Sequence, residues 1–132
     1  MRIFPLNSIE VLEVVNSVCK ENGSWDLASQ QPKNQEILER CLKPLRGPGT
    51  LSLRAAKSFC AILRYKPFRS QNRRLATAII LAFLARNNSW IRMTPAELLW
   101  LVRLPEGRPP QWEAAVDAVE GFMKRRLTSL RR

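Results

Sequence analysis

Basic and polar side chains gather at residues 66–74, directly before the apolar run from Leu75 to Ala85. A helix that begins near Asn72 leaves its first backbone N–H groups without intrahelical partners and carries partial positive charge there, so anions bind at such ends. Two adjacent arginines in that first turn add donors that match phosphate oxygens. The segment contains no acid and no histidine, so it predicts phosphate binding without an evident catalytic pair. It reads Lys66-Pro67-Phe68-Arg69-Ser70-Gln71-Asn72-Arg73-Arg74.

Charge is distributed unevenly along the chain. The 132 residues include 22 Lys and Arg against 11 Asp and Glu, which gives a formal net charge of +11. No acid occurs between Glu39 and Glu97, whereas a solvated surface normally mixes both signs. A one-sided field attracts polyanions, so we expect this interval to bind an anionic ligand. Its cations are Arg40, Lys43, Arg46, Arg54, Lys57, Arg64, Lys66, Arg69, Arg73, Arg74, Arg86 and Arg92.

The cysteines and the apolar segments bear on the compartment. Cys19, Cys41 and Cys60 are widely spaced and the chain has no histidine, so no metal-binding pattern is present. We interpret the three thiols as small buried apolar groups in a reducing compartment. The first residues lack the apolar core of a signal peptide, and the run from Leu75 to Ala85 is too short to cross a membrane. The sequence therefore predicts no metal site, no membrane contact and a cytoplasmic location.

Apolar spacing and capping residues predict about six helices. Asn7 and Glu10 have the spacing of a capping box, Ser52 is expected to cap the third helix, and Thr94-Pro95-Ala96-Glu97 combines a cap, a proline and a capping-box acid. The predicted helices cover residues 7–22, 34–42, 52–65, 72–86, 94–103 and 111–127, with irregular segments at 25–32, 43–50 and 105–110.

The helix at 72–86 is apolar on nearly every face, which is typical of the buried axis of a domain. We find no alternating strand of useful length and no internal repeat. The length and the 45% content of hydrophobic residues fit one domain that spans residues 1–132. The sequence thus predicts an all-α domain of about six helices packed around a central buried helix.

The turn between two buried helices resembles the motif of the Fic/Doc family, and in particular its Doc branch of death-on-curing toxins. The family motif reads His-Pro-Phe-x-Asp-Gly-Asn-Lys/Gly-Arg, and Lys66 to Arg74 align with it without a gap. In the family the helix that follows ends in Phe-Leu and then Asn-Gly, and here it ends with Phe83-Leu84 and then Asn87-Asn88. The resemblance implies a Doc-like fold over residues 1–132. It also implies ATP or another nucleotide as ligand, a translation-related protein target and a small antitoxin.

The matching positions are those that bind phosphate and shape the loop. Pro67, Phe68, Asn72 and Arg74 agree with the motif, and Arg73 occupies its other basic position. The resemblance and the residue types together assign Pro67 and Phe68 a structural role. They assign phosphate binding to Arg69, Ser70, Asn72, Arg73 and Arg74.

The positions that carry catalysis in the family differ here. Lys66 replaces the histidine that acts as general base, Ser70 replaces the acid that holds magnesium, and Gln71 replaces a glycine. A lysine serves as base only where desolvation or like charge deprotonates it, and a lone hydroxyl is a weak anchor for magnesium. Lys66 is therefore the one candidate catalytic residue, and its alternative role is a charged contact to phosphate.

Three functions remain open from the sequence. The first is a Doc-like protein, related to toxin–antitoxin systems, that binds a phosphate-containing ligand and has lost or altered catalysis. The second is a basic nucleic-acid-binding module on the same fold, for which affinity would fall steeply with salt. The third is a divergent nucleotide-dependent protein transferase or kinase that uses Lys66.

Overall fold

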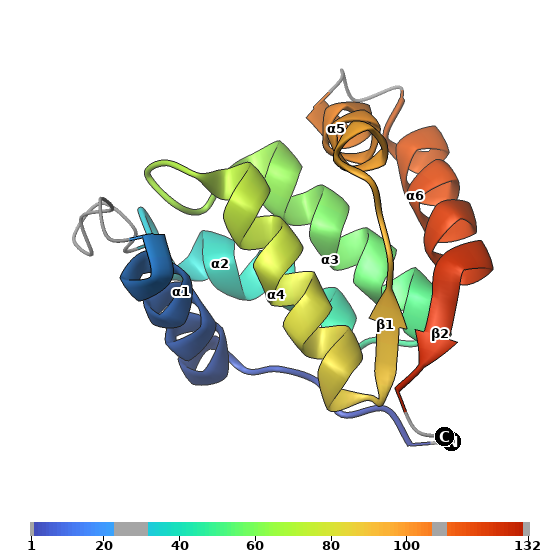
Figure 1. The fold of residues 1–132 in the computed structure, drawn as a ribbon. Coiled ribbons are helices and arrows are strands. Elements are labelled where there is room, and N and C mark those ends of the chain that lie inside the picture. The colour runs from blue at the N-terminus through green and yellow to red at the C-terminus, as the bar shows by residue number, and fades with distance from the viewer. Residues whose placement is uncertain (1, 23–31, 107–110, 131–132) are drawn as a thin grey trace.

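The computed structural model describes residues 2–22, 32–106 and 111–130, and these residues are mostly helical (Figure 1). This confirms the all-α class. No helix among them is both long and apolar enough to cross a membrane. The helices are α1 (Ser8–Asn22), α2 (Gln35–Leu42), α3 (Leu51–Tyr65), α4 (Asn72–Arg86), α5 (Pro95–Arg103) and α6 (Trp112–Arg126), and two short 3-10 helices are η2 (Lys43–Arg46) and η3 (Leu104–Glu106).

Helix α3 is the centre of the fold. It packs against α2, η2, α4, η3 and α6, while α4 packs against α1, α3 and the first strand. In Figure 1 the pair α3–α4 lies between α1 and α2 on one side and α5 and α6 on the other. The sequence placed the buried axis at residues 72–86, and the structure places it one helix earlier. Small residues explain the difference, because Ala55, Ala56 and Ala61 in α3 are buried and let neighbours approach closely.

Local signals set most of the helix ends. Asn7 and Glu10 exchange side-chain-to-backbone hydrogen bonds, and Thr94 and Glu97 form a complete capping box. The predicted cap at Ser52 is wrong, because Thr50 caps α3 by accepting from the backbone N–H of Leu53 at 3.2 Å. Ser52 lies inside the helix and is buried.

Of the three segments that were expected to be irregular, two contain 3-10 helix and two lie partly outside the described residues. The range 43–50 is not irregular throughout, because its first four residues form η2, in which Pro44 occupies the first turn. The range 105–110 begins within η3, and its remainder, 107–110, lies outside the described residues. The range 25–32 also lies outside them except for Pro32.

A short antiparallel strand pair, absent from the sequence prediction, closes one side of the fold. Strands β1 (Ser89–Ile91) and β2 (Leu127–Ser129) pair with Trp90 opposite Thr128. Three residues a strand are too few for an alternating pattern to be recognised. The pair fastens the end of α6 to the chain that leaves α4.

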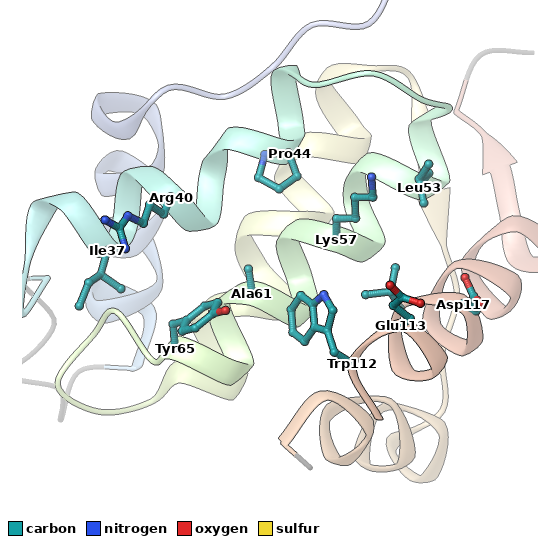
Figure 2. Close-up of a pocket in the computed structure, with 11 residues that line it drawn as sticks. Ile37, Arg40, Pro44, Leu53, Lys57, Ala61, Tyr65, Trp112, Glu113 and Asp117 are labelled. Carbon is teal, nitrogen blue, oxygen red and sulfur yellow. The ribbon is translucent and has the colours of Figure 1, made fainter. Parts of the chain in front are cut away.

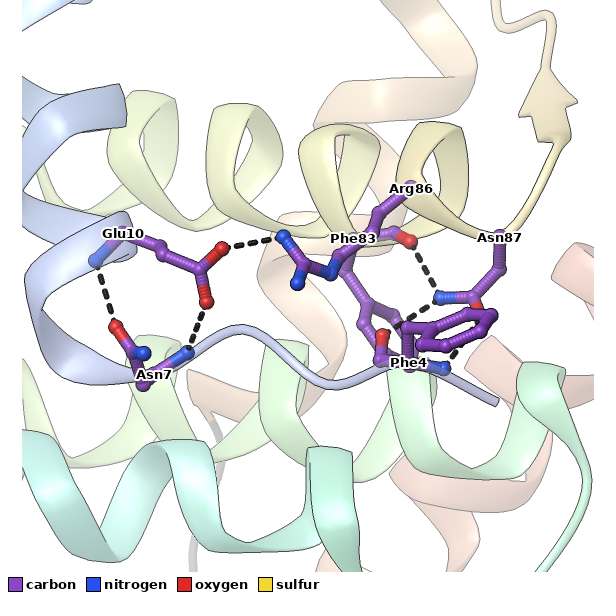
Figure 3. A network of polar contacts seen from close by, with 6 residues as sticks. All are labelled: Phe4, Asn7, Glu10, Phe83, Arg86 and Asn87. Atoms are coloured by element: carbon purple, nitrogen blue, oxygen red, sulfur yellow. Dashed lines mark hydrogen bonds and ion pairs between the residues drawn. The ribbon is translucent and has the colours of Figure 1, made fainter. Parts of the chain in front are cut away.

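A polar network fastens the N-terminal segment to the end of α4 (Figure 3). The Asn87 side chain accepts from the backbone N–H of Phe4 at 2.7 Å and donates to the carbonyls of Phe4 and Phe83, each at 2.9 Å. Nearby, Arg86 forms an ion pair with Glu10. One asparagine thus both ends α4 and holds the chain that leads into α1.

We predict that Asn87→Ala destabilises the protein by about 1–3 kcal/mol, because it leaves the partly buried Phe83 carbonyl and both backbone groups of Phe4 without this partner. Urea unfolding measures the change. Asn88→Gly is the neighbouring control, because glycine adopts the positive φ of 60° at that position without strain, so its replacement is expected to cost less than the loss of three hydrogen bonds. A smaller loss for Asn87→Ala than for Asn88→Gly would contradict the prediction.

Candidate phosphate-binding site

The loop from Lys66 to Gln71 joins α3 to α4 and is fixed by the side chain of Asn72. The Asn72 Oδ1 atom accepts from the backbone N–H of Phe68 at 3.0 Å, and Nδ2 donates to the Phe68 carbonyl at 2.9 Å. Both polar atoms of the amide are therefore engaged within the loop. Asn72 thus shapes the loop, and its assignment to phosphate from the sequence stays a prediction, since each amide hydrogen-bonding atom has one bond here.

The loop is also held by burial of its residues and by contacts from the segment that precedes α2. Pro67 and Phe68 are buried, and the Phe68 side chain is 0% exposed within the core. Pro32 forms an isolated antiparallel bridge with Phe68, and the Lys33 N–H donates to the Pro67 carbonyl at 2.8 Å. Pro67 and Phe68 thus occupy the structural positions that the sequence predicted.

Two residues of the loop adopt left-handed backbone conformations. Lys66 has a φ of 47° and Gln71 a φ of 60°. Non-glycine residues rarely occupy this region, and they do so at a cost where surrounding structure imposes it. Position 71 is where the family motif has glycine, and its positive φ gives the physical reason why glycine suits that position. Gln71, the N-cap residue of α4, supplies no side-chain hydrogen bond to the first N–H groups of that helix.

Glu106 in η3 contributes an acid to this region that the sequence did not place there. Arg73 donates from Nη2 to Glu106 Oε1 at 2.6 Å and from Nε to Oε2 at 3.1 Å, so the pair is bidentate. The hydrogen bonds from Arg73 are the largest cause that lowers the pKa of Glu106, and the charges of Arg73, Lys66 and Arg103 lower it further. The pKa of Arg73 is raised by the same hydrogen bonds. The separation of 33 residues offers no sequence signal for this contact.

The start of α4 therefore lies in a group of basic side chains. Lys66, Arg73 and Arg103 all act electrostatically on Glu106, and Arg74 follows Arg73 in the first turn of α4. We call Lys66, Arg73, Arg74 and Arg103 the cationic cluster. Glu106 contacts this cluster through its pair with Arg73.

Arg69, Ser70 and Arg74, three of the predicted phosphate contacts, are exposed at the same loop and helix start. Lys66 is exposed as well, so it lacks the desolvation that a lysine needs to act as a general base. The contact of its charge with a phosphate stays a prediction. The structure thus brings the predicted cations together at one place, but it assigns one of them, Arg73, to an internal carboxylate.

The residues at this loop do not fit a magnesium site. Ser70 stands where the family has its acid, and Glu106, the carboxylate that contacts the first turn of α4, already accepts two hydrogen bonds from Arg73. Among the residues that the structure describes, no group of three or more His, Cys, Asp or Glu side chains is arranged to hold a metal ion. Magnesium prefers carboxylate oxygen, and the one here is committed to an arginine.

The three cysteines are free and buried, in agreement with the sequence interpretation. Burial raises the pKa of Cys41 and of Cys60 to about 12, and it also raises that of Cys19. A thiol must be deprotonated to act as a nucleophile or metal ligand. The cysteines therefore contribute packing rather than chemistry.

A groove apart from the cationic cluster lies between α2, α3 and α6 (Figure 2). Its volume is about 890 Å³. Tyr65 and Trp112 line it, and their ring centroids are 6.3 Å apart. Arg40 and Lys57 supply positive charge and α6 supplies Glu113 and Asp117, so the groove lacks the one-sided field of the cationic cluster. No sequence pattern predicts this groove, because its walls come from residues 37–44, 53–65 and 112–117, which are far apart in the chain.

Neither a protein-family model nor a curated protein matches this chain. Its function is therefore inferred from its residues and their geometry.

We predict that Asn72→Ala lowers the free energy of unfolding by about 1–3 kcal/mol, because two partly buried backbone groups of Phe68 lose their partner. Asn72→Asp keeps the acceptor for the Phe68 N–H and is expected to lose less. Chemical denaturation measures both variants. Unchanged stability in both would show that the amide does not hold the loop.

We predict that the Arg73–Glu106 pair makes stability depend on pH in the acidic range. Because folding lowers the pKa of Glu106 below its ordinary 4.5, the stability it contributes is present above that pH and is lost as the pH falls through the lowered folded value. Urea unfolding of the protein and of Glu106→Gln, from pH 7 to pH 3, should show the two stability curves converging below about pH 4.5. A constant difference between them over the whole range would refute this role.

Proposed function

We propose that this chain is a Doc-like protein that binds a phosphate-containing ligand at the 66–74 loop and the start of α4, without the magnesium-dependent transfer reaction of the family. The cationic cluster is the observation that carries the proposal. A phosphate there would meet the first N–H groups of α4 and several exposed cations, and both favour an anion. In this proposal the chain is a regulator or binding partner, in a setting related to toxin–antitoxin systems.

The loss of catalysis follows from what the loop lacks. Lys66 is exposed, Ser70 offers a hydroxyl in place of a carboxylate, and Glu106 is paired with Arg73. A transfer reaction needs a base that can take a proton and a means of neutralising the transferred phosphate. The cationic cluster can neutralise phosphate charge, but it supplies no base. This favours binding over turnover.

Arg74 is the residue on which we test the proposal. We expect Arg74→Ala to weaken the binding of ATP and of inorganic phosphate roughly tenfold or more, because a charge-assisted hydrogen bond is lost. Removing magnesium should leave the affinity unchanged. Isothermal titration calorimetry at fixed ionic strength measures both effects.

Arg92→Ala is the matched control, because Arg92 is an exposed cation outside the cluster and its loss changes the net charge equally. It should alter the affinity less than twofold. Equal weakening by both variants would mean that overall charge, rather than this site, binds the anion. Magnesium-dependent transfer of labelled phosphate from ATP to a protein, abolished by Lys66→Ala, would replace the proposal with the divergent-transferase alternative.

The nucleic-acid alternative makes a different prediction for salt. A protein that contacts about six phosphates on duplex DNA loses affinity with a log–log slope near −5. Two of the basic residues in the acid-free interval outside the cluster are already paired with acids from the flanking segments, Arg46 with Glu39 and Arg86 with Glu10. This pairing reduces the field available for a long polyanion and favours a small ligand.

A further inference from the structure

An apolar groove runs between α4 and α5 and ends at the cationic cluster. Its volume is about 460 Å³, within the range of small-molecule sites. Helix α5 contributes its residues at helical spacing, so one face of that helix is turned toward α4. Arg73 and Arg74 lie at the end where α4 begins. The apolar and small lining residues are Thr77, Ala78, Leu81, Pro95, Leu98, Leu99 and Val102.

The groove is accessible and its apolar wall is incompletely covered. Leu99 is 43% exposed, and the neighbouring Trp100 is 48% exposed. Thr77 is the one polar side chain beyond the arginines, and its hydroxyl donates to the Arg73 carbonyl at 2.9 Å. The groove floor therefore offers no free polar group of its own, so its contacts to a ligand would be apolar.

The charge at the two ends differs. At one end lie Arg74 and Arg73, of which Arg73 is paired with Glu106, and Arg103 stands one residue after the lining residue Val102. At the other end lie Leu81 and Pro95, which carry no charge. A ligand that complements this surface has an anionic head and one apolar chain.

We propose that the groove takes the apolar chain of a single-chain alkyl or acyl phosphate, whose phosphate lies on the cationic cluster. This inference rests on the proposed phosphate site and adds the chemical class of its ligand. A groove of about 460 Å³ between two helices suits one chain of a free molecule better than the surface of a bilayer.

The test compares inorganic phosphate with a series of n-alkyl phosphates, from butyl to dodecyl, each below its critical micelle concentration. Calorimetry with the full chain should show affinity rising about two- to fourfold for each added methylene, where fourfold corresponds to about 0.8 kcal/mol for full burial of a CH₂. Arg74→Ala should weaken every member of the series by the same factor.

Two groove variants with a matched control test the chain-binding part. Ala78→Phe fills the groove, and Ala85→Phe places the same side chain at an exposed position of the same helix. Leu99→Asn removes apolar surface at an exposed position, so it bears little risk to folding. Ala78→Phe and Leu99→Asn should reduce dodecyl phosphate binding at least fivefold and leave inorganic phosphate binding unchanged, while Ala85→Phe should change neither.

The outcomes separate this inference from the proposed function. If inorganic phosphate binds and chain length has no effect, the inference fails and the phosphate site stands. If neither phosphate nor any alkyl phosphate binds, the phosphate site itself fails. Binding of dodecanol as tightly as dodecyl phosphate would remove the role of the arginines and overturn the inference.

Two other occupants of the groove would also overturn it. Vesicles that contain an anionic phospholipid, tested by flotation, should bind no better than neutral vesicles once the alkyl phosphate saturates the protein. Vesicle binding without binding of the monomeric alkyl phosphate would assign the groove to a membrane surface. A dimer in analytical ultracentrifugation that Leu99→Asn dissociates would assign it to a second copy of the chain.

Discussion

The burial of α3 on most of its faces is the constraint on which the rest of the structure depends. Only small side chains allow helices to approach it from several directions, and Ala55, Ala56 and Ala61 provide them. The polar Ser58 is also buried, and its hydroxyl donates to the Cys41 carbonyl at 2.5 Å. Its burial therefore leaves no hydroxyl without a hydrogen-bond partner. With α3 fixed, the loop at its end and the start of α4 have a defined place against η3.

That place decides the chemistry of the loop. Asn72 holds the backbone of Phe68 from one side, and the buried Phe68 ring anchors it from the other. The side chain that the motif suggests for phosphate thus also holds the loop together. Around it, the cations Lys66, Arg69 and Arg74 are exposed at the start of α4. Buried contacts thus fix the conformation of the loop, while its charged side chains lie at the surface.

Acids from the flanking segments return to the basic middle of the chain and change its character. Glu10 pairs with Arg86, Glu39 with Arg46 and Glu106 with Arg73. The twelve cations that form an acid-free interval in sequence therefore do not form an uninterrupted field in space. Surface pairs of this kind add little stability, but they reduce the positive field around the cations that they join. The apolar groove beside α4 begins at one of these pairs, Arg73 with Glu106.

The sequence by itself determined the helical class and most helix ends. Capping boxes such as Thr94–Glu97 act within four residues, and Pro67 stops the preceding helix, which ends at Tyr65. Only the tertiary structure decided which helix is central and where the β1–β2 pair forms. It also brought Glu106 to Arg73 and set α5 against α4. The physical reason is range, since caps and helical periodicity are local, whereas burial and ion pairing depend on segments that meet only when the chain has folded.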